Sequence, residues 1–437
     1  MYADSVRCDM LRDDVEADLR ERFQTEGPRL YPAYEDYCFG NVPRTLTSAL
    51  GEPTGTRALP ADVYDDVPGV SVDDERDVDY VLLFLVDGFG LAQWHDHRDH
   101  SVVSAVERAT TVTPLTSVFP SETAAAITTL NTGAYPAEHG VLGWDVYDPA
   151  LDASFLGLRF EGTGGSDVSA YDAEDAFAAD AMYPGLDERG VDCRTVAPFP
   201  SSYSGATASQ YDGEDLATLP ATVADAVEDA DDPAYVYVYL PQIDGSGHHD
   251  GNHSPAYADV VDETWTAVAD AVAAAEAAVD ADDDVLVAFT ADHGQIDTVP
   301  DRNVDLTEYP TVVDGLERFS DGSPVYLSGG PRSVELHVRD DATAAVRRVL
   351  ENDVGAFVLD GEDALAQDLY GDGPLSPETE RRVGDLVVLH PELGVYCAVG
   401  AAAKSLRFVG MHGGLHPDEM LVPFAAGRLD DVAEALS

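Results

Sequence analysis

The sequence predicts an α/β protein, a three-layer αβα sandwich around a doubly wound, mostly parallel sheet, with a second, small α/β subdomain. Near-continuous apolar runs at 79–86, 234–240 and 284–290 are typical of strands buried on both faces. Helix-like segments separate these runs, an alternation that indicates parallel pairing. Apolar residues make up 45% of the 437 residues, enough for the core of one large domain or two medium ones.

The chain order supports one catalytic core domain at 76–305, preceded by an N-terminal wrap at 1–75 that begins with a short helix near 8–23. Residues 145–185, rich in Asp, Gly and Ser, are interpreted as a loop or cap inserted in the core domain. The remaining predicted core elements are helices at about 90–100, 123–130, 219–228 and 255–279, and strands at 112–118 and 192–198.

A shorter β-α-β-α pattern over 331–370 predicts the small α/β subdomain, to which we assign residues 306–383. The last segment, 384–437, is expected to return to the core, beginning with a strand at 384–389. The four cysteines form no CxxC pair, which argues against a thiolate metal site or a disulfide framework.

The charge is strongly acidic, with 83 acidic against 24 basic residues and a formal net charge of -59. The acid is spread along the chain and the apolar pattern persists, so we predict adaptation to a high-salt cytosol and not disorder, because the Debye length falls to roughly 3 Å near 1 M salt. Such a surface repels nucleic-acid polymers and anionic lipid. No signal peptide or membrane-spanning run is found, and we expect a halophilic cytoplasmic protein of undetermined oligomeric state.

Acidic and histidine side chains follow the three buried strands and recur in a Gly-rich turn near the C-terminus. Because the carboxyl ends of parallel strands meet at one edge of a sheet, we expect these side chains to converge there. Mixed Asp and His ligands suit borderline divalent metals such as Zn, Mn or Fe. The predicted ligands are Asp87 after the first strand, Asp244 and His248 after the second, Asp292 and His293 after the third, and His412 in the turn GMHGGLH.

The sequence also predicts the local structure around Asp244 and His248 and around Thr123, which lies near the start of the Ala-rich helix. Two glycines separate Asp244 from His248, so this spacing is interpreted as a loop. The Ala-rich helix is expected to begin near 121–123, which places Thr123 where free backbone N–H groups and the positive helix end attract anions.

Five motifs occur in a fixed order between about residues 80 and 425, namely VDGFG, FPSETAAAITTLNTGAYPAEHG, DGSGHHDG, TADHG and GMHGG. In these motifs the chain resembles the alkaline phosphatase superfamily and, within it, the type I phosphodiesterase/nucleotide pyrophosphatase family. The resemblance implies an alkaline-phosphatase-like fold, two divalent metal ions, zinc or manganese, and hydrolysis of a small phosphate ester or nucleotide-like substrate.

The resemblance also implies a nucleophile. In the family this residue lies nine positions before the threonine of a Thr-Gly pair, and counting back from Thr132 gives Thr123, with Ser121 as the alternative. Thr123 would form a covalent phospho-threonine that water then hydrolyses. The implied ligand sets are Asp244, His248 and His412 for one metal ion, and Asp87, Asp292, His293 and the Thr123 oxygen for the other.

The substrate contacts depart from the family pattern. Trp144 stands where an asparagine of relatives contacts a phosphate oxygen, and it either stacks on a base or forms core or wall. Ala124 follows the nucleophile, where relatives often carry an aromatic or amide side chain. FPSET lacks the arginine of sulfatases, which excludes that class. The absence of Arg or Lys between Arg108 and Arg159 favours diesters over monoesters.

We therefore predict a phosphodiesterase/nucleotide pyrophosphatase. An alkaline-phosphatase-type phosphomonoesterase and a phosphonate hydrolase are alternatives on the same site, and a non-catalytic metal- or ligand-binding relative is the alternative from another class. His416, close to His412, is a reserve ligand, and His139 is expected to brace a loop by hydrogen bonding.

Overall fold

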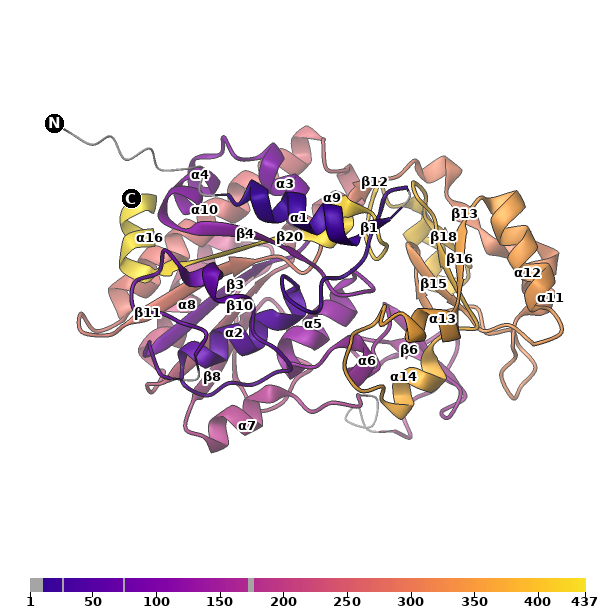
Figure 1. Ribbon diagram of the computed structural model, residues 1–437, viewed down its shortest axis with the longest axis horizontal. Helices are drawn as coiled ribbons and strands as arrows, with labels where there is room; N and C mark the ends of the chain where they lie inside the picture. Colours follow the sequence, from indigo (N-terminus) through magenta and orange to yellow (C-terminus); the bar gives the residue numbers. More distant parts are fainter. Residues whose placement is uncertain (1–10, 26, 74, 172–176) are drawn as a thin grey trace.

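A computed structural model describes residues 11–25, 27–73, 75–171 and 177–437 (Figure 1). Its larger lobe is built on a seven-stranded sheet. The strands are β3 (Tyr80–Val86), β4 (Thr111–Thr116), β8 (Asp192–Ala197), β9 (Thr207–Gln210), β10 (Ala234–Leu240), β11 (Val285–Thr290) and β20 (Leu421–Arg428). Their spatial order is β4-β20-β11-β3-β10-β8-β9, and only β20 runs antiparallel to its neighbours.

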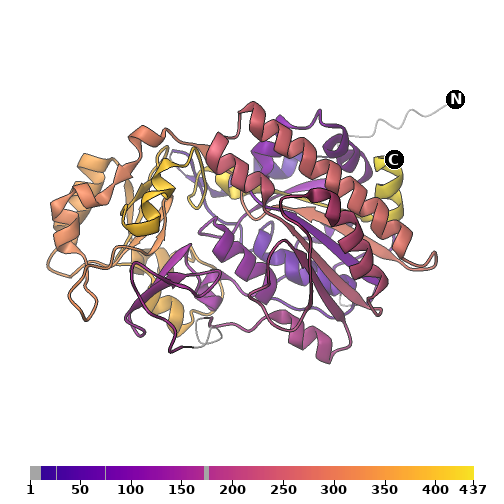
Figure 2. The same ribbon diagram turned by 180° about the vertical axis from the view of Figure 1, so that it is seen from behind.

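Helices cover both faces of this sheet, which gives the predicted three-layer αβα sandwich (Figure 2). The strand period of two separates the faces: Leu82 and Phe84 of β3 pack into one core, and Leu83 and Leu85 into the other. The first face carries α1 (Asp13–Phe23), α3 (Leu91–Asp96), α4 (Ser101–Ala109), α8 (Leu219–Glu228), α10 (Pro255–Ala278) and α16 (Leu429–Leu436). The second carries α2 (Val42–Ala49), α5 (Thr123–Thr132) and α7 (Met182–Glu188).

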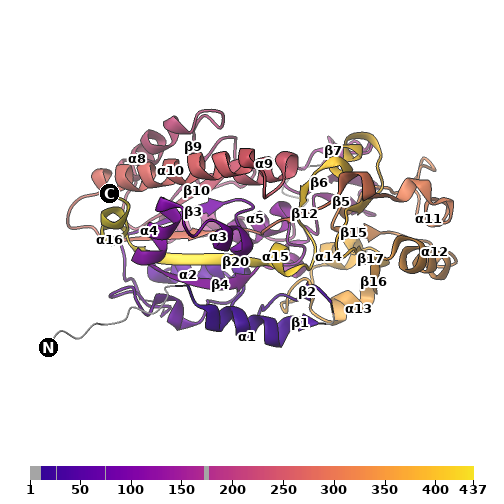
Figure 3. The same ribbon diagram turned by 90° about the horizontal axis from the view of Figure 1, so that it is seen from above.

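The smaller lobe is built on a second seven-stranded sheet, beside the first when seen from above (Figure 3). Its strands are β5 (Asp145–Asp148), β6 (Ala153–Leu156), β7 (Gly162–Thr163), β14 (Gly329–Gly330), β15 (Ser333–Leu336), β16 (Phe357–Asp360) and β17 (Leu386–Leu389). Their order is β16-β17-β15-β14-β5-β6-β7, with antiparallel pairing throughout. Its helices are α11 (Pro310–Gly315), α12 (Thr343–Val349), α13 (Gly361–Ala366) and α14 (Pro377–Arg382).

This pairing corrects two expectations. The first part of 145–185 is not irregular, because β5, β6 and β7 extend the small sheet across β14. Residues 384–389 do not return to the core sheet, because β17 pairs with β15 and β16, and only β20 re-enters it. The first error arises because strands such as β5 (DVYD) are short and polar and resemble loop sequence. The second arises because a short apolar run such as LVVL fits an interior strand of either sheet equally well. We propose a small domain that combines 145–163 with 306–389.

The remaining α-helices and β-strands of the described ranges are short. They are β1 (Gln24–Thr25), β2 (Arg29–Leu30), β12 (Ile296–Asp297), β13 (Val304–Asp305), β18 (Val395–Tyr396), β19 (Gly410–Met411), α6 (Pro136–His139), α9 (Gln242–Asp250) and α15 (Pro417–Met420). Residues 8–10 of the expected first helix, Cys8 and part of the expected cap, 172–176, lie outside the described residues. None of the helices within the described ranges is long and apolar enough to span a bilayer.

His139 at the end of α6 is fully buried and braces its turn through both ring nitrogens. Nδ1 accepts a hydrogen bond from the Val141 N–H (3.1 Å), so Nε2 carries the proton and faces Thr129 Oγ1 (3.0 Å). Burial lowers the pKa of His139 to about 3. Because this pKa lies below the unfolded value, the neutral ring contributes stability that is present above about pH 6.5 and lost as pH falls toward 3.

We expect the free energy of unfolding to lose about 3 kcal/mol through His139 between about pH 7 and pH 4.5. In His139→Asn the amide oxygen can still accept from Val141 but cannot titrate, so this variant should lose correspondingly less over that range. Urea unfolding of both proteins in molar KCl measures the difference. Equal losses in the two proteins would contradict this role for the histidine.

Candidate active site

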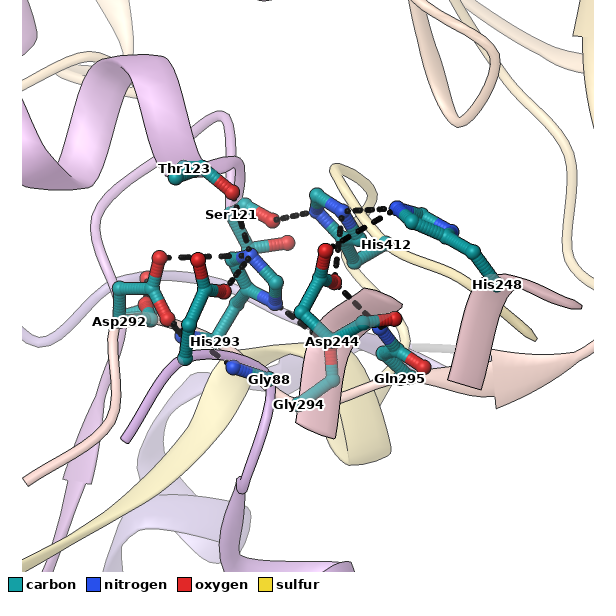
Figure 4. Close-up of polar contacts among 12 residues, drawn as sticks. Gly88, Ser121, Thr123, Asp244, His248, Asp292, His293, Gly294, Gln295 and His412 are labelled. Atoms are coloured by element: carbon teal, nitrogen blue, oxygen red, sulfur yellow. Dashed lines mark hydrogen bonds and ion pairs between the residues drawn. The ribbon is translucent and has the colours of Figure 1, made fainter. Parts of the chain in front are cut away.

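The carboxyl edge of the central sheet gathers the predicted side chains (Figure 4). Asp87 directly follows β3, and Asp292 and His293 follow β11, its parallel neighbour. Gly88 takes a positive φ of 73°, which turns the chain so that its N–H donates to Asp292 Oδ1 at 3.3 Å. The sheet thus brings carboxylates about 200 residues apart in sequence into one cluster.

Asp244 and His248 lie on helix α9 and not in a loop as predicted. Their i,i+4 spacing places both on one helix face, with His248 Nε2 at 3.3 Å from Asp244 Oδ2. A Cβ at Gly247 would collide with the Gln295 side chain. The intervening glycine is therefore needed for close packing, a role that sequence alone does not distinguish from a turn.

One cluster surrounds His293 Nε2. This atom lies 3.0 Å from Thr123 Oγ1, 3.4 Å from Asp87 Oδ1 and 3.4 Å from Asp292 Oδ2. Asp87, Asp292 and His293 each offer a ligand atom, and these atoms all lie within 4.8 Å of one another. The grouping has the donor types and spacing of a metal site.

A second cluster adjoins the first. Asp244, His293 and His412 also bring their ligand atoms within 4.8 Å of one another. His412 Nε2 lies 3.4 Å from Asp244 Oδ1 and 3.3 Å from His248 Nε2. The His412 ring stacks on the His293 ring at 3.6 Å between centroids, so the two clusters are in direct contact.

The three histidines are oriented as metal ligands require. Each Nδ1 faces a backbone carbonyl oxygen, at 2.8 Å for His248, 3.0 Å for His293 and 3.3 Å for His412. Because only an N–H can bond to a carbonyl, each Nδ1 carries the hydrogen and each Nε2 presents a lone pair. Lone pairs from His248 and His412 that converge beside a carboxylate fit a cation and not a hydrogen bond.

Burial makes the ionised form of the carboxyl groups in this site energetically unfavourable. Burial, together with the charges of Asp292 and Asp244, raises the pKa of Asp87 well above its usual range, and burial likewise raises the pKa of Asp292. Asp87 Oδ1 and Asp292 Oδ2 are buried with no hydrogen-bond partner among the described residues. Converging, unpaired, buried carboxylate oxygens are the arrangement that a divalent cation neutralises.

Thr123 is the first residue of α5, and the neighbouring hydroxyls are engaged elsewhere. Ser121 Oγ donates to the Gly414 carbonyl at 2.7 Å, so it neither caps the helix nor points into either cluster. His416 immediately precedes α15 and caps it, because its Nδ1 accepts from the Asp418 N–H, and it belongs to neither cluster.

The two residues predicted to contact substrate, Trp144 and Ala124, lie in different surroundings. Trp144 is 37% exposed and lines a cavity of about 270 Å³ together with Thr123 and His412, so it forms wall and not core. The Ala124 side chain is fully buried in the core on the α5 side of the sheet and does not line this cavity. Only its backbone remains available for a substrate contact.

Sequence reasoning missed three residues beside these clusters, two that contact a ligand and one that lines the cavity. The Tyr239 hydroxyl donates to Asp87 Oδ2, and Gln295 Nε2 donates to Asp244 Oδ1. Glu122 lines the cavity, and burial raises its pKa to about 8. The sequence contained a signal only for Tyr239. The tyrosines of AYVYVYL alternate along β10 and so share one face of the strand, and Tyr239 is the last of them, nearest the carboxyl end of the strand.

The model of the family described as type I phosphodiesterase / nucleotide pyrophosphatase matches residues 81–415, most of the chain and every residue of both clusters. The chain belongs to this family. As a type I phosphodiesterase/nucleotide pyrophosphatase it is a hydrolase of phosphate esters, and its two ligand clusters suit the divalent metal dependence typical of the family.

Solved structures of a mammalian phosphodiesterase share the fold. Murine ectonucleotide pyrophosphatase / phosphodiesterase 5, as an inactive threonine-to-alanine variant in complex with AMP, is 18% identical, with a TM-score of 0.59 over 79% of this chain and 87% of that chain. A second structure of the murine protein is 20% identical, with a TM-score of 0.58 over 79% of this chain and 88% of that chain. The human protein is 17% identical, with a TM-score of 0.58 over 79% and 87%.

Proposed function

We propose that this chain hydrolyses small phosphodiesters or pyrophosphates, including nucleotide-like ones, with two divalent metal ions and a covalent phospho-threonine at Thr123. The observation that carries the proposal is the position of Thr123 Oγ1, 3.0 Å from His293 Nε2 at the start of a helix and beside unpaired buried carboxylates. The net charge of -59 supports activity in a salt-rich cytoplasm.

The ligand clusters suit zinc, with manganese as the alternative, because both accept mixed carboxylate and imidazole donors. When bound, such ions polarise phosphoryl oxygens and lower the pKa of a coordinated hydroxyl. The proposed ligands are Asp244, His248 and His412 for one ion, and Asp87, Asp292, His293 and Thr123 for the other.

The chain's own groups account for positioning and bond exchange. The Thr123 hydroxyl gives up its proton to solvent, and its oxygen attacks phosphorus. The Oγ–P bond forms as the bond to the leaving oxygen breaks; the leaving oxygen takes up a proton from water, and the rest of the ester stays on Thr123. The first turn of α5 begins at Thr123, and its backbone N–H groups, including that of Ala124, would stabilise the negative charge of a phosphoryl group bound there. Water then cleaves the Oγ–P bond and restores the threonine.

The cavity favours a diester, which carries less negative charge than a monoester. The described residues that line it include neither Arg nor Lys, and they include the buried Glu122. Arg159 and Arg194, which follow this stretch in the chain, do not line it either: Arg159 lines a neighbouring cavity, and Arg194 pairs with Asp192 at 2.9 Å. A dianionic monoester would therefore meet no cationic side chain there and would depend on the metal ions and the α5 backbone N–H groups for charge compensation.

The neighbouring cavity, about 350 Å³, suits the organic part of the ester. Ile127 follows Thr123 by one helical turn and lines this cavity together with Phe199, Tyr203 and Tyr239. Aromatic walls of this kind stack on planar groups such as nucleobases. The AMP bound by the murine neighbour supports the same substrate class.

Hydrolysis of bis-p-nitrophenyl phosphate and p-nitrophenyl phosphate, in molar KCl with zinc or manganese, tests the proposal. We expect kcat/KM for the diester to exceed that for the monoester by at least about tenfold. A faster monoester would indicate an alkaline-phosphatase-type enzyme, and a preference for a phosphonate ester would indicate a phosphonate hydrolase. Bound metal without turnover of any ester would identify a non-catalytic relative.

A further inference from the structure

The active-site cavity of about 270 Å³ has an apolar wall that neither the nucleophile nor the proposed ligands account for. Four of the residues that line it are apolar, and they come from separate parts of the chain. They are Trp144 directly before β5, Pro331 between β14 and β15, Phe408 shortly before β19, and Met411 at the end of β19. None of the described residues that line the cavity is Arg or Lys. Such a wall suits an uncharged organic group beside the reacting phosphorus.

The two aromatic rings of this wall are placed for contact with a substrate. The Phe408 ring stacks on the His248 ring at 4.4 Å between centroids, so it lies against a proposed ligand. Trp144 is 37% exposed, whereas the other two tryptophans, Trp94 and Trp265, are each 1% exposed. An indole ring left open at a cavity offers its apolar surface to a ligand, because contact of that surface with water is unfavourable.

The apolar wall lies on the side of phosphorus from which the leaving group departs. In an in-line displacement the attacking and leaving oxygens lie on opposite sides of phosphorus. The attacking oxygen, Thr123 Oγ1, lies 3.0 Å from His293 Nε2 in the first cluster, and the second cluster adjoins it (Figure 4). The cavity is lined by Asp244, His248 and His412 of the second cluster and, apart from Thr123, by no other proposed ligand. The departing group therefore enters this cavity.

The part of the ester that stays on Thr123 has a separate place. The neighbouring cavity of about 350 Å³ begins one helical turn after Thr123, at Ile127, and its lining includes the charged side chains of Arg159 and Glu161. The two cavities share no lining residue. A diester can therefore place a polar group such as a nucleoside in the neighbouring cavity and an apolar group in the active-site cavity.

We propose that the leaving group is an uncharged, apolar or aromatic alcohol that packs against Trp144 and Phe408. The inference rests on the proposed function, which supplies the attacking oxygen of Thr123. The bond from phosphorus to the alcohol oxygen breaks as the Oγ–P bond forms, and the alcohol oxygen takes up a proton from water. A cavity of about 150 Å³ holds benzene, so this one has room for a substituted aromatic ring.

A nucleoside triphosphate is the contrasting substrate, because its leaving group is pyrophosphate. Pyrophosphate would carry several negative charges into a cavity that is lined by the buried Glu122 and by no Arg or Lys among the described residues. The preferred substrates are therefore phosphodiesters of apolar alcohols and not nucleoside polyphosphates.

Two thymidylate diesters that differ only in the leaving phenol test the inference with the zinc-loaded protein in molar KCl. The phenols p-chlorophenol and p-carboxyphenol have nearly equal acidity, so the esters differ in charge and not in the ease of breaking the bond. We expect kcat/KM to be at least about tenfold higher for the p-chlorophenyl ester. Trp144→Ala should lower that value about tenfold and change the p-carboxyphenyl ester much less.

Phe199→Ala is the matched control, because this aromatic ring lines the neighbouring cavity. The two esters share the thymidine that we place there, so this variant should lower kcat/KM for both by the same factor.

A binding measurement gives a readout that needs no turnover. Trp144 is the only one of the three tryptophans that is not buried. Bis-p-nitrophenyl phosphate bound to zinc-loaded Thr123→Ala should therefore quench tryptophan fluorescence, because a nitrophenyl ring lies against the indole. In the double variant with Trp144→Phe, calorimetry should still detect binding and the quenching should be lost.

Equal kcat/KM for the two thymidylate esters, or an equal loss for both in Trp144→Ala, would overturn the inference. Hydrolysis of thymidine triphosphate as efficient as that of the p-chlorophenyl ester would overturn it as well. Failure of the zinc-loaded protein to hydrolyse any ester would contradict the proposed function instead. In that case the fluorescence of Trp144 still decides whether this cavity takes an aromatic group, and unchanged fluorescence on binding would exclude it.

Discussion

Replacing Thr123 with alanine is expected to lower kcat for bis-p-nitrophenyl phosphate on the order of 10⁴-fold or more. The proposed reaction passes through a bond between Thr123 Oγ1 and phosphorus, and the variant has no oxygen at the start of α5 to form it. The side chain is 6% exposed and makes a hydrogen bond to His293, so its truncation leaves the helix and the histidine in place. Steady-state kinetics in molar KCl measures the loss.

A direct readout accompanies the rate. Acid quenching of the wild type during turnover of bis-p-nitrophenyl phosphate should leave a phosphopeptide in which Thr123 carries the remaining p-nitrophenyl phosphoryl group, detectable by mass spectrometry and absent from the variant. Ser121→Ala is the matched control, because Ser121 Oγ donates to the Gly414 carbonyl and its loss disturbs only that contact. If Ser121→Ala abolished the phosphopeptide while Thr123→Ala kept it, the nucleophile would be Ser121.

The central sheet could be predicted because its strands carry an unambiguous pattern. β3, β10 and β11 are buried on both faces, so their sequences are nearly all apolar and stand out from the surrounding acid. The order of the motifs then predicted which loops share one sheet edge. Asp87, Asp292 and His293 lie together there because parallel pairing aligns the strand ends.

The small sheet could not be predicted, because its strands are short and their partners are distant in sequence. β5 and β6 have four residues each, and β5 joins the sheet only through β14, which lies far along the chain. No local periodicity encodes such pairing. The same limit explains the error at α9, where the need for Gly247 comes from Gln295, a residue of another segment.

The side chains that contact the proposed ligands could not be predicted from the sequence either. Gln295 and Glu122 have ordinary sequence surroundings, and the period-two tyrosines of β10 place Tyr239 on one face of the strand without indicating that it contacts Asp87. Ligand types and their order are encoded in motifs, whereas the groups that orient the ligands are selected by tertiary geometry. The sequence therefore predicted the proposed ligands but not the side chains that hydrogen-bond to them.

Changing Asp292 to asparagine is expected to weaken metal binding and to lower turnover on the order of 10³-fold or more, since metal ions contribute several kcal/mol of transition-state stabilisation. Asp292 is fully buried, and its Oδ2, 3.4 Å from His293 Nε2, has no hydrogen-bond partner among the described residues. Asparagine fills the same volume but loses the negative charge. Zinc content after dialysis and the zinc dissociation constant measure the change, with Asp270→Asn on the exposed face of α10 as the control for loss of one charge.

Stability without metal distinguishes a ligand from a structural carboxylate. Burial and the nearby carboxylate of Asp244 raise the pKa of Asp292, so in the metal-free protein its negative charge is unfavourable. Metal-free Asp292→Asn should therefore unfold at a urea concentration at least as high as the wild type. Zinc at about 1,000 times its dissociation constant should stabilise the wild type by about 4 kcal/mol and the variant by much less. A metal-free variant less stable than the wild type, with an unchanged response to zinc, would assign Asp292 to the scaffold, because only a ligand is destabilising until its metal ion is bound.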